Sequence, residues 1–300
     1  MEPESCEALR EATRGCRLVL LAATDIEAEP LLRAFREPAT WVVLTKKLVV
    51  GAVAAERDTA KRGVAGGAVQ AVLAISGCDK VNAAHTLACL LLTMDPQPSL
   101  VLQVGVAGAF PGSGVGRRPG VGDLVFATEE IYSDTGSSSP AGWIPAGELG
   151  LPIACLGGIE SGGRFPLEAR LVQAAVEVVD RIDDKGWPGG RPAVFAGPCV
   201  TSSRVTGIRS EGELIARRWD AVAESMEGAA AAQVCALHGV PFLEVRGISN
   251  LVVDRERDSW EVTRAAEVAG RAALAVTAAL DTLPLPGRPA SPGSPPPSEA

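Results

Sequence analysis

Three polar residues could do chemistry together: Glu27, Glu227 and Asn250. Each lies where an apolar run ends or an alanine-rich helical segment begins. A carboxylate such as Glu27 can take a proton from water, and a second such as Glu227 can accept two hydrogen bonds from a vicinal diol. The amide of Asn250 can donate one hydrogen bond and accept another, which suits a heterocycle with a ring nitrogen beside a carbonyl. Ligands of open α/β sheets bind beyond the carboxyl ends of strands, so the three residues could line one pocket.

Each of these residues also has an ordinary structural explanation. Acidic residues in the first turn complement the helix dipole, so Glu27, Glu29 and Glu227 could serve only their helices. Asn250 could simply form a turn. Only the joint occurrence of the three favours a site.

Other chemistries lack their motifs. The glycine cluster 112–116 precedes an expected strand rather than the helix that would hold a pyrophosphate, and neither G-x-x-x-x-G-K-[ST] nor G-x-S-x-G occurs. The seven cysteines have no C-x₂-C spacing, and there are only two histidines. We therefore expect buried, reduced thiols, no metal and no cofactor.

The charge balance predicts what the protein does not bind. Twenty-eight Lys and Arg residues against 36 Asp and Glu give a net charge of −8. This argues against nucleic acid or an anionic membrane as a partner. The first fifteen residues carry four glutamates and no apolar core, and no apolar run reaches the ~18 residues of a membrane span. We expect a cytoplasmic protein whose partners are a small molecule and water.

The elements that would position the three residues alternate along the chain, which predicts an α/β fold. Hydrophobic residues make up 47% and aromatic ones 4%, so the core should consist of Ala, Val, Leu and Ile. Strands are expected over 17–23, 41–53 (two, broken near Lys46-Lys47), 70–76, 100–104, 123–128, 193–201 and 241–248. Helices are expected over 25–35, 78–94, 167–184, 229–237 and from about 258 to 280, the last opened by a capping box of Asp258 and Glu261. Charged loop 56–67 and irregular segment 132–147 separate some of them.

The chain is expected to hold one domain. Residues 1–15 form a polar leader, 16–283 the domain, and 284–300 a disordered tail in which prolines, serines and glycines are 12 of 17 residues.

Two groups of motifs carry a family resemblance. The segments SMEGAA (225–230) and HGVPFLEVRGISN (238–250) resemble the C-terminal signature of the nucleoside phosphorylase and nucleosidase superfamily. Segments 104–114 with 122–125, and 132–136 with 140–143, resemble the futalosine hydrolases of menaquinone biosynthesis within it. The likeness spans most of 17–280. It implies a single-domain, twisted mixed sheet flanked by helices, a homo-oligomer, and cleavage of an N-ribosidic bond.

The resemblance also implies a role for each residue. Glu27 matches the carboxylate that activates water, Glu227 the acceptor for the ribose diol, and Asn250 the residue that faces purine N7. The expected substrate-binding residues are Met226 on the sugar, Ala107 and Gly108 under sugar and base, Val205 and Thr206 beside the base, and Ser249 next to Asn250. Nucleosidases for 6-aminopurines carry Asp where Asn250 stands and Glu where Ser225 stands, so a hypoxanthine leaving group is expected.

Several alternatives stay open. The first loop, 23–27, is acidic and lacks arginine, which favours water over phosphate as nucleophile. The second hypothesis for an enzyme is a methylthioadenosine/S-adenosylhomocysteine-type or 6-amino-6-deoxyfutalosine nucleosidase. The hypothesis without enzyme activity is a catalytically dead nucleoside-binding protein. Arg164, Arg204, Arg209 and the loop 132–143 are all candidates for holding the benzoate arm of futalosine.

Overall fold

The structure is a computed structural model that describes residues 3–43, 45–53, 68–111, 117–255 and 259–286, with side chains from residue 7 onward. Its strands are β1 (Leu18–Ala22), β2 (Phe35–Val43), β3 (Lys46–Val53), β4 (Val69–Ile75), β5 (Leu100–Ala109), β6 (Leu124–Tyr132), β7 (Gly136–Ser139), β8 (Gly142–Pro145), β9 (Ala154–Leu156), β10 (Ile159–Ser161), β11 (Arg164–Pro166), β12 (Val194–Thr201), β13 (Ala223–Ser225) and β14 (Phe242–Leu251). Its α-helices are α1 (Pro3–Ala12), α2 (Asp25–Leu32), α4 (Lys80–Thr93), α5 (Ala169–Asp180), α6 (Arg209–Trp219), α7 (Gly228–His238) and α8 (Val262–Ala278).

One mixed sheet organises the molecule. Its strands pair in the order β11-β6-β12-β13-β5-β1-β4-β3-β2, and β14 pairs with both β5 and β6. The last pairing closes β5, β14, β6, β12 and β13 into a ring. Because β4, β1, β5 and β14 run parallel, their carboxyl ends meet at one edge. The expected α/β class and mixed sheet are confirmed.

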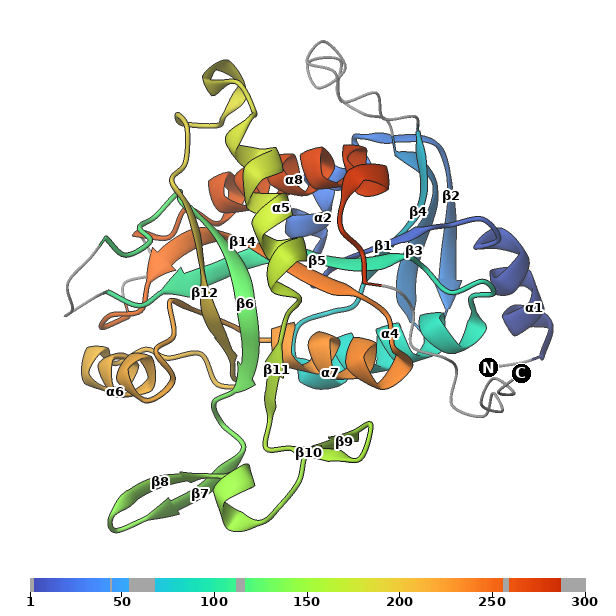
Figure 1. Cartoon of the computed structure of the whole chain (residues 1–300). Coiled ribbons are helices and arrows are strands. Elements are labelled where there is room, and N and C mark those ends of the chain that lie inside the picture. Colours follow the sequence, from blue (N-terminus) through green and yellow to red (C-terminus); the bar gives the residue numbers. More distant parts are fainter. Residues whose placement is uncertain (1–2, 44, 54–67, 112–116, 256–258, 287–300) are drawn as a thin grey trace, which may run out of the picture.

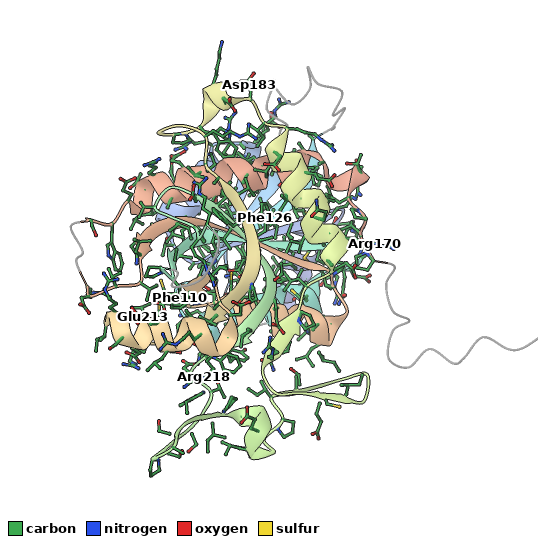
Figure 2. All side chains as sticks on the ribbon, turned by 60° about the vertical axis from the view of Figure 1, so that its left-hand side comes forward. Phe110, Phe126, Arg170, Asp183, Glu213 and Arg218 are labelled. Carbon is green, nitrogen blue, oxygen red and sulfur yellow. The ribbon has the colours of Figure 1, made fainter. Side chains whose placement is uncertain are left out.

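Helices cover both faces of this sheet. Helices α2, α5 and α8 lie on one face, and α4 and α7 lie on the other (Figure 1). Apolar side chains of α2, α5 and α8 form one core cluster with those of β1, β4, β5 and β14. Apolar side chains of α4 and α7 belong to a second core cluster. Figure 2 shows Phe126, which is fully buried, in the middle of the molecule, with Glu213 and Arg218 of α6 at its surface. This two-sided burial explains why most strands are apolar throughout.

Most expected elements appear, but several boundaries were wrong. The helix expected over 25–35 is α2, which ends at Leu32 rather than Phe35, because Phe35 begins β2. The segment expected to be irregular contains the β7–β8 hairpin, and α6 was not expected at all. The last helix begins at Val262 with Glu261 as its N-cap residue, without a side-chain cap, and Asp258 lies outside the described residues.

The sequence also predicts a polar leader and a disordered tail at the two ends of the chain. Residues 3–12 form α1, and the buried Leu9 lies in the same core cluster as α4. The division into leader, domain and tail stays a prediction, and most of the tail and the loop 56–67 lie outside the described residues. Within the part of the chain that the structure describes, no helix is long and apolar enough to cross a membrane.

Candidate active site

Glu27 lies in the first turn of α2, just beyond the end of β1. The Thr24 hydroxyl accepts a hydrogen bond from the Glu27 amide at 3.3 Å. Glu27 Oε2 accepts from the Thr24 amide and hydroxyl, each at 2.9 Å, which completes a capping box. Capping of the helix therefore explains only one oxygen of the Glu27 carboxylate. The other oxygen, Oε1, faces β5.

Glu27 Oε1 accepts a hydrogen bond from the Val106 amide at 2.9 Å. A carboxylate offers about four lone-pair positions, and the described residues use three of them. One position on Oε1 therefore stays available to a water molecule. Gly105 makes this approach possible, because a Cβ there would overlap both Glu27 Oε1 and Arg246 Nη1.

Glu227 occupies the N-cap position of α7, but its side chain makes no hydrogen bond to the helix end. Its Oε1 accepts from the Asp79 amide at 3.0 Å, and its Oε2 lies 3.4 Å from Arg246 Nη2. Asp79 has a φ of 84°, a strained conformation of the kind that concentrates at functional sites. Burial raises the pKa of Glu227, although Arg246 and the Asp79 amide act in the opposite direction. Helix capping therefore does not account for Glu227.

Arg246, from β14, joins the two carboxylates. Its side chain is only 2% exposed, and Nη1 lies 3.9 Å from Glu27 Oε1. Its Nε donates a hydrogen bond to the buried Glu244. Burial lowers the pKa of Arg246, but the carboxylates of Glu244, Glu227 and Glu27 outweigh it and raise the value overall. The guanidinium thus stays charged and offsets part of the surrounding negative charge.

Asn250 lies within β14 and lines a pocket of about 160 Å³. The other lining residues are Val121, Thr206, Leu251, Val253, Arg255, Ser259 and Trp260. The Ser249 hydroxyl donates to Asn250 Oδ1 at 2.8 Å, and Asn250 Nδ2 donates to the Leu251 carbonyl at 3.2 Å. These bonds fix the amide so that one Nδ2 hydrogen remains for a ligand. The alternative in which Asn250 only forms a turn is wrong, because the residue pairs with β5.

Successive residues of β5 connect the carboxylates to this pocket. Val106 donates to Glu27, the Ala107 carbonyl lies 3.3 Å from the Ser249 hydroxyl, and Gly108 pairs with Asn250. A Cβ on Gly108 would lie 3.1 Å from Asn250 Nδ2, so the small residue leaves room for the amide. Two strand residues span about 7 Å, a separation that suits two adjacent rings of one small molecule.

The remaining predicted residues lie around these two parts. Met226 is half-buried between Ser225 and Glu227, and the buried Ser225 hydroxyl has no hydrogen-bond partner among the described residues. Thr206 lines the pocket, but Val205 is 37% exposed and does not. No metal-binding group of three or more His, Cys, Asp or Glu occurs among the described residues. The expectation of buried cysteines is correct for Cys16, Cys199 and Cys235 but wrong for Cys78 and Cys155, which are exposed.

The sequence reasoning gave no role to four residues at the site. Asp79 and Arg246 bind Glu227, and Glu244 binds Arg246. Glu224 holds Thr206 by accepting from its amide at 2.9 Å and its hydroxyl at 2.7 Å. One signal was present in the sequence: Glu244 and Arg246 are alternate residues in an otherwise apolar strand, so both face one side of it.

Two of the three arginines proposed for a substrate's acidic arm already have carboxylate partners. Arg164 pairs with Glu129 at 2.5 Å, and Arg204 pairs with Glu211. For Arg209, it is the backbone amide and not the guanidinium that donates a hydrogen bond, to Asp254 Oδ1 at 2.9 Å. None of the three lines the pocket that contains Asn250.

Comparisons with known proteins identify the family of the chain. A family model described as the phosphorylase superfamily matches residues 17–283. The chain is 31% identical to a futalosine hydrolase of Streptomyces coelicolor over 272 residues, which are 89% of this chain and 94% of that protein. It is 32% identical to a futalosine hydrolase of Thermus thermophilus over 66% of this chain and 76% of that protein. A 5′-methylthioadenosine/S-adenosylhomocysteine nucleosidase of Geobacillus kaustophilus is 32% identical, over 64% and 72%.

Solved structures show the same fold. A 5′-methylthioadenosine/S-adenosylhomocysteine nucleosidase from Neisseria meningitidis, in complex with methylthio-immucillin-A, superposes with a TM-score of 0.67 at 22% identity. The match covers 87% of this chain and 98% of that one. A nucleosidase of the same kind from Colwellia psychrerythraea, in complex with adenine, gives 0.68 at 21% identity over 88% and 95%.

Proposed function

The chain belongs to the phosphorylase superfamily as one of its nucleosidases, and from this premise we propose that it hydrolyses the N-ribosidic bond of futalosine and releases hypoxanthine. The identity to futalosine hydrolases over most of the chain supports the substrate. The observation that carries the proposal is the amide of Asn250 at the pocket, held by Ser249. The one free Nδ2 hydrogen can be shared between N7 and O6 of a 6-oxopurine, but an amide cannot supply a proton to adenine.

The two buried carboxylates would act on the sugar side of the bond. Glu27 has one lone-pair position left on Oε1, from which it would take a proton from the attacking water. Glu227 would accept hydrogen bonds from the ribose hydroxyls as positive charge develops on the sugar. Met226 would pack against the ribose, and Ala107 and Gly108 would form the floor beneath sugar and base.

The charge around Arg246 supports water rather than phosphate as nucleophile. Arg246 is an arginine at the site that the sequence reasoning did not weigh, and it could in principle attract an anion. Its guanidinium already faces Glu27, Glu227 and Glu244. An incoming phosphate would meet these carboxylates and be repelled, whereas neutral water would not.

Base release from three nucleosides tests the proposal. The purified protein is incubated with futalosine, its 6-amino analogue and methylthioadenosine, with and without phosphate, and the released base is identified by chromatography. We expect hypoxanthine from futalosine, at a rate independent of phosphate. Faster adenine release from methylthioadenosine or the 6-amino analogue would reassign the substrate. No release from any of them would support a nucleoside-binding protein without catalytic activity.

Assembly into a homo-oligomer is part of the proposal and rests on the family resemblance. Light scattering on the purified protein measures it directly.

A further inference from the structure

A second carboxyl pair lies behind Arg246. Glu130 of β6 and Glu244 of β14 are both fully buried, and their carboxyl groups lie against the same residue, Gly228. Glu130 Oε1 and Glu244 Oε2 are buried and have no hydrogen-bond partner among the described residues. Two ionised carboxylates cannot hydrogen-bond to each other, because each offers only acceptors, whereas one proton held between them would satisfy both of these oxygens.

Gly228 shows how closely the two groups approach the start of α7. A Cβ on Gly228 would overlap Glu130 Oε2 and also Glu244 Oε2. The first residue of α7 must therefore lack a side chain for both carboxyls to fit. The same packing excludes water, so neither charge can be stabilised by solvent.

We propose that Glu130 carries a proton that it donates to Glu244, and that this acid pair positions Arg246 against Glu227 and Glu27. The inference rests on the proposed function only where it concerns catalysis. Glu130 and Glu244 do not touch the sugar or the base, so both are positioning residues.

Once Glu130 carries this proton, each carboxyl oxygen of Glu130 and Glu244 has a hydrogen-bond partner. The Ala229 amide donates to the Thr201 hydroxyl at 2.7 Å, and that hydroxyl donates to Glu130 Oε2 at 2.9 Å. The proton on Glu130 Oε1 then satisfies Glu244 Oε2. Glu244 Oε1 accepts from Arg246 Nε. Arg246 Nη2 then lies against Glu227, and Nη1, which donates to the Val106 carbonyl at 3.3 Å, lies 3.9 Å from Glu27 Oε1.

The groups that face Glu130 agree with a neutral acid. Burial raises its pKa well above the ordinary value, the negative charge of Glu244 raises it further, and Arg246 and the Thr201 hydroxyl act against this. Cys199 of β12 and Tyr132 of β6 also face it, and their own pKa values are raised, first by burial and then by Glu130. Arg246 is the one cation among these facing groups, and it is bound directly to Glu244.

Infrared spectroscopy detects the proton without any substrate. A protonated carboxyl gives a carbonyl stretching band that a carboxylate does not. We expect this band at neutral pH in the intact protein, and we expect the Glu130→Gln variant to lose it. Glu129→Gln is the matched control, because it removes the neighbouring carboxyl, which pairs with Arg164 instead. Retention of the full band in Glu130→Gln would overturn the proposal.

Turnover separates positioning from simple packing. The amide of Glu130→Gln can still donate to Glu244 and accept from Thr201, so kcat should stay within about threefold of the parent. Glu244→Gln removes the charge behind Arg246 and should lower kcat roughly 10- to 100-fold with a smaller change in KM. Loss of turnover in Glu130→Gln as large as in Glu244→Gln would contradict the shared proton. If the protein cleaves no futalosine at all, the proposed function fails, and the infrared result still decides the protonation of Glu130.

Discussion

Arg246 Nη2 lies 3.4 Å from Glu227 Oε2, and both side chains are almost completely buried. A buried ion pair of this kind is weak evidence for stability, because desolvation cancels much of the attraction. Here the pair connects the residue proposed to hold the ribose with the strand that carries Asn250. We therefore infer that this ion pair fixes the relative positions of Glu227 and β14, and the predictions below test that geometry.

Glu27→Gln should lower kcat by about 10² to 10⁴, because the amide cannot take a proton from water. Substrate binding should largely survive, since the amide oxygen can still accept from Thr24 or Val106. Steady-state kinetics with futalosine measure both effects. Glu29→Gln is the control, because Glu29 is exposed and its carboxylate contacts only Arg33, at 3.8 Å, among the described residues. Near-normal turnover in Glu27→Gln would remove Glu27 from the role of general base.

Gly105→Ala should lower kcat at least tenfold, because its methyl group would overlap Glu27 Oε1 and Arg246 Nη1. The overpacking should also cost about 1 to 3 kcal/mol of unfolding free energy. Kinetics and urea unfolding measure the two effects separately. Gly120→Ala is the matched control, since its methyl group would only come within 3.7 Å of Asp123 Oδ2, an ordinary contact. Equal behaviour of the two variants would show that the approach of Glu27 to β5 does not matter.

Patterns of apolar residues predicted the sheet well, because strands buried on both faces are apolar runs. Glu27 and Glu227 could be predicted as site residues since acids after such strands are conspicuous. Glu130 could not, because an acid in a strand with polar neighbours resembles a solvent-facing residue. The role of Asp79 depends on its backbone amide and its positive φ, which side-chain chemistry does not reveal.

Local composition also concealed two elements. Helix α6 is rich in charged residues and has only Gly212 and Trp219 buried, so it lacks a clear apolar stripe. The β7–β8 hairpin begins with one glycine and three serines, residues that favour loops over strands. Neither the periodicity nor the composition of these segments therefore indicated a regular element.

The unfolding free energy should fall as the pH rises from about 4.5 toward neutral. Burial raises the pKa of Glu130, Glu224 and Glu227 above 4.5, so the folded state holds protons that the unfolded chain releases in this range. Their contribution to stability is complete below the unfolded pKa and is lost as the pH passes the folded values. Urea unfolding across this range measures the slope.

Glu224→Gln should flatten this dependence, by up to about 1.4 kcal/mol for each pH unit over which Glu224 alone differs in protonation between the two states. Glu160→Gln, at an exposed position, is the control and should leave the slope unchanged. A stability that rises with pH over the same range in the parent protein would contradict the raised pKa values.

Asn250→Asp should narrow the preference for 6-oxopurine over 6-aminopurine substrates. In the parent, the one free Nδ2 hydrogen of Asn250 would be shared between N7 and O6 of hypoxanthine, whereas an adenine amino group would face this donor and leave buried hydrogens unpaired. Sites built around one hydrogen-bonding group can discriminate by roughly 10⁴, so the parent's preference for futalosine over its 6-amino analogue should be large. The ratio of kcat/KM for the two substrates measures it.

The direction of the change with pH makes the test of Asn250 specific. In the Asn250→Asp variant, a protonated carboxyl can deliver a proton to N7 while its other oxygen accepts from the 6-amino group, but an ionised carboxylate would repel O6. The gain on the 6-amino substrate should therefore grow as the pH falls. Asn250→Ala is the comparison, since it removes both donor and acceptor and should lower both activities. If Asn250→Asp loses both activities in parallel like Asn250→Ala, the residue holds β14 against Gly108 and does not select the base.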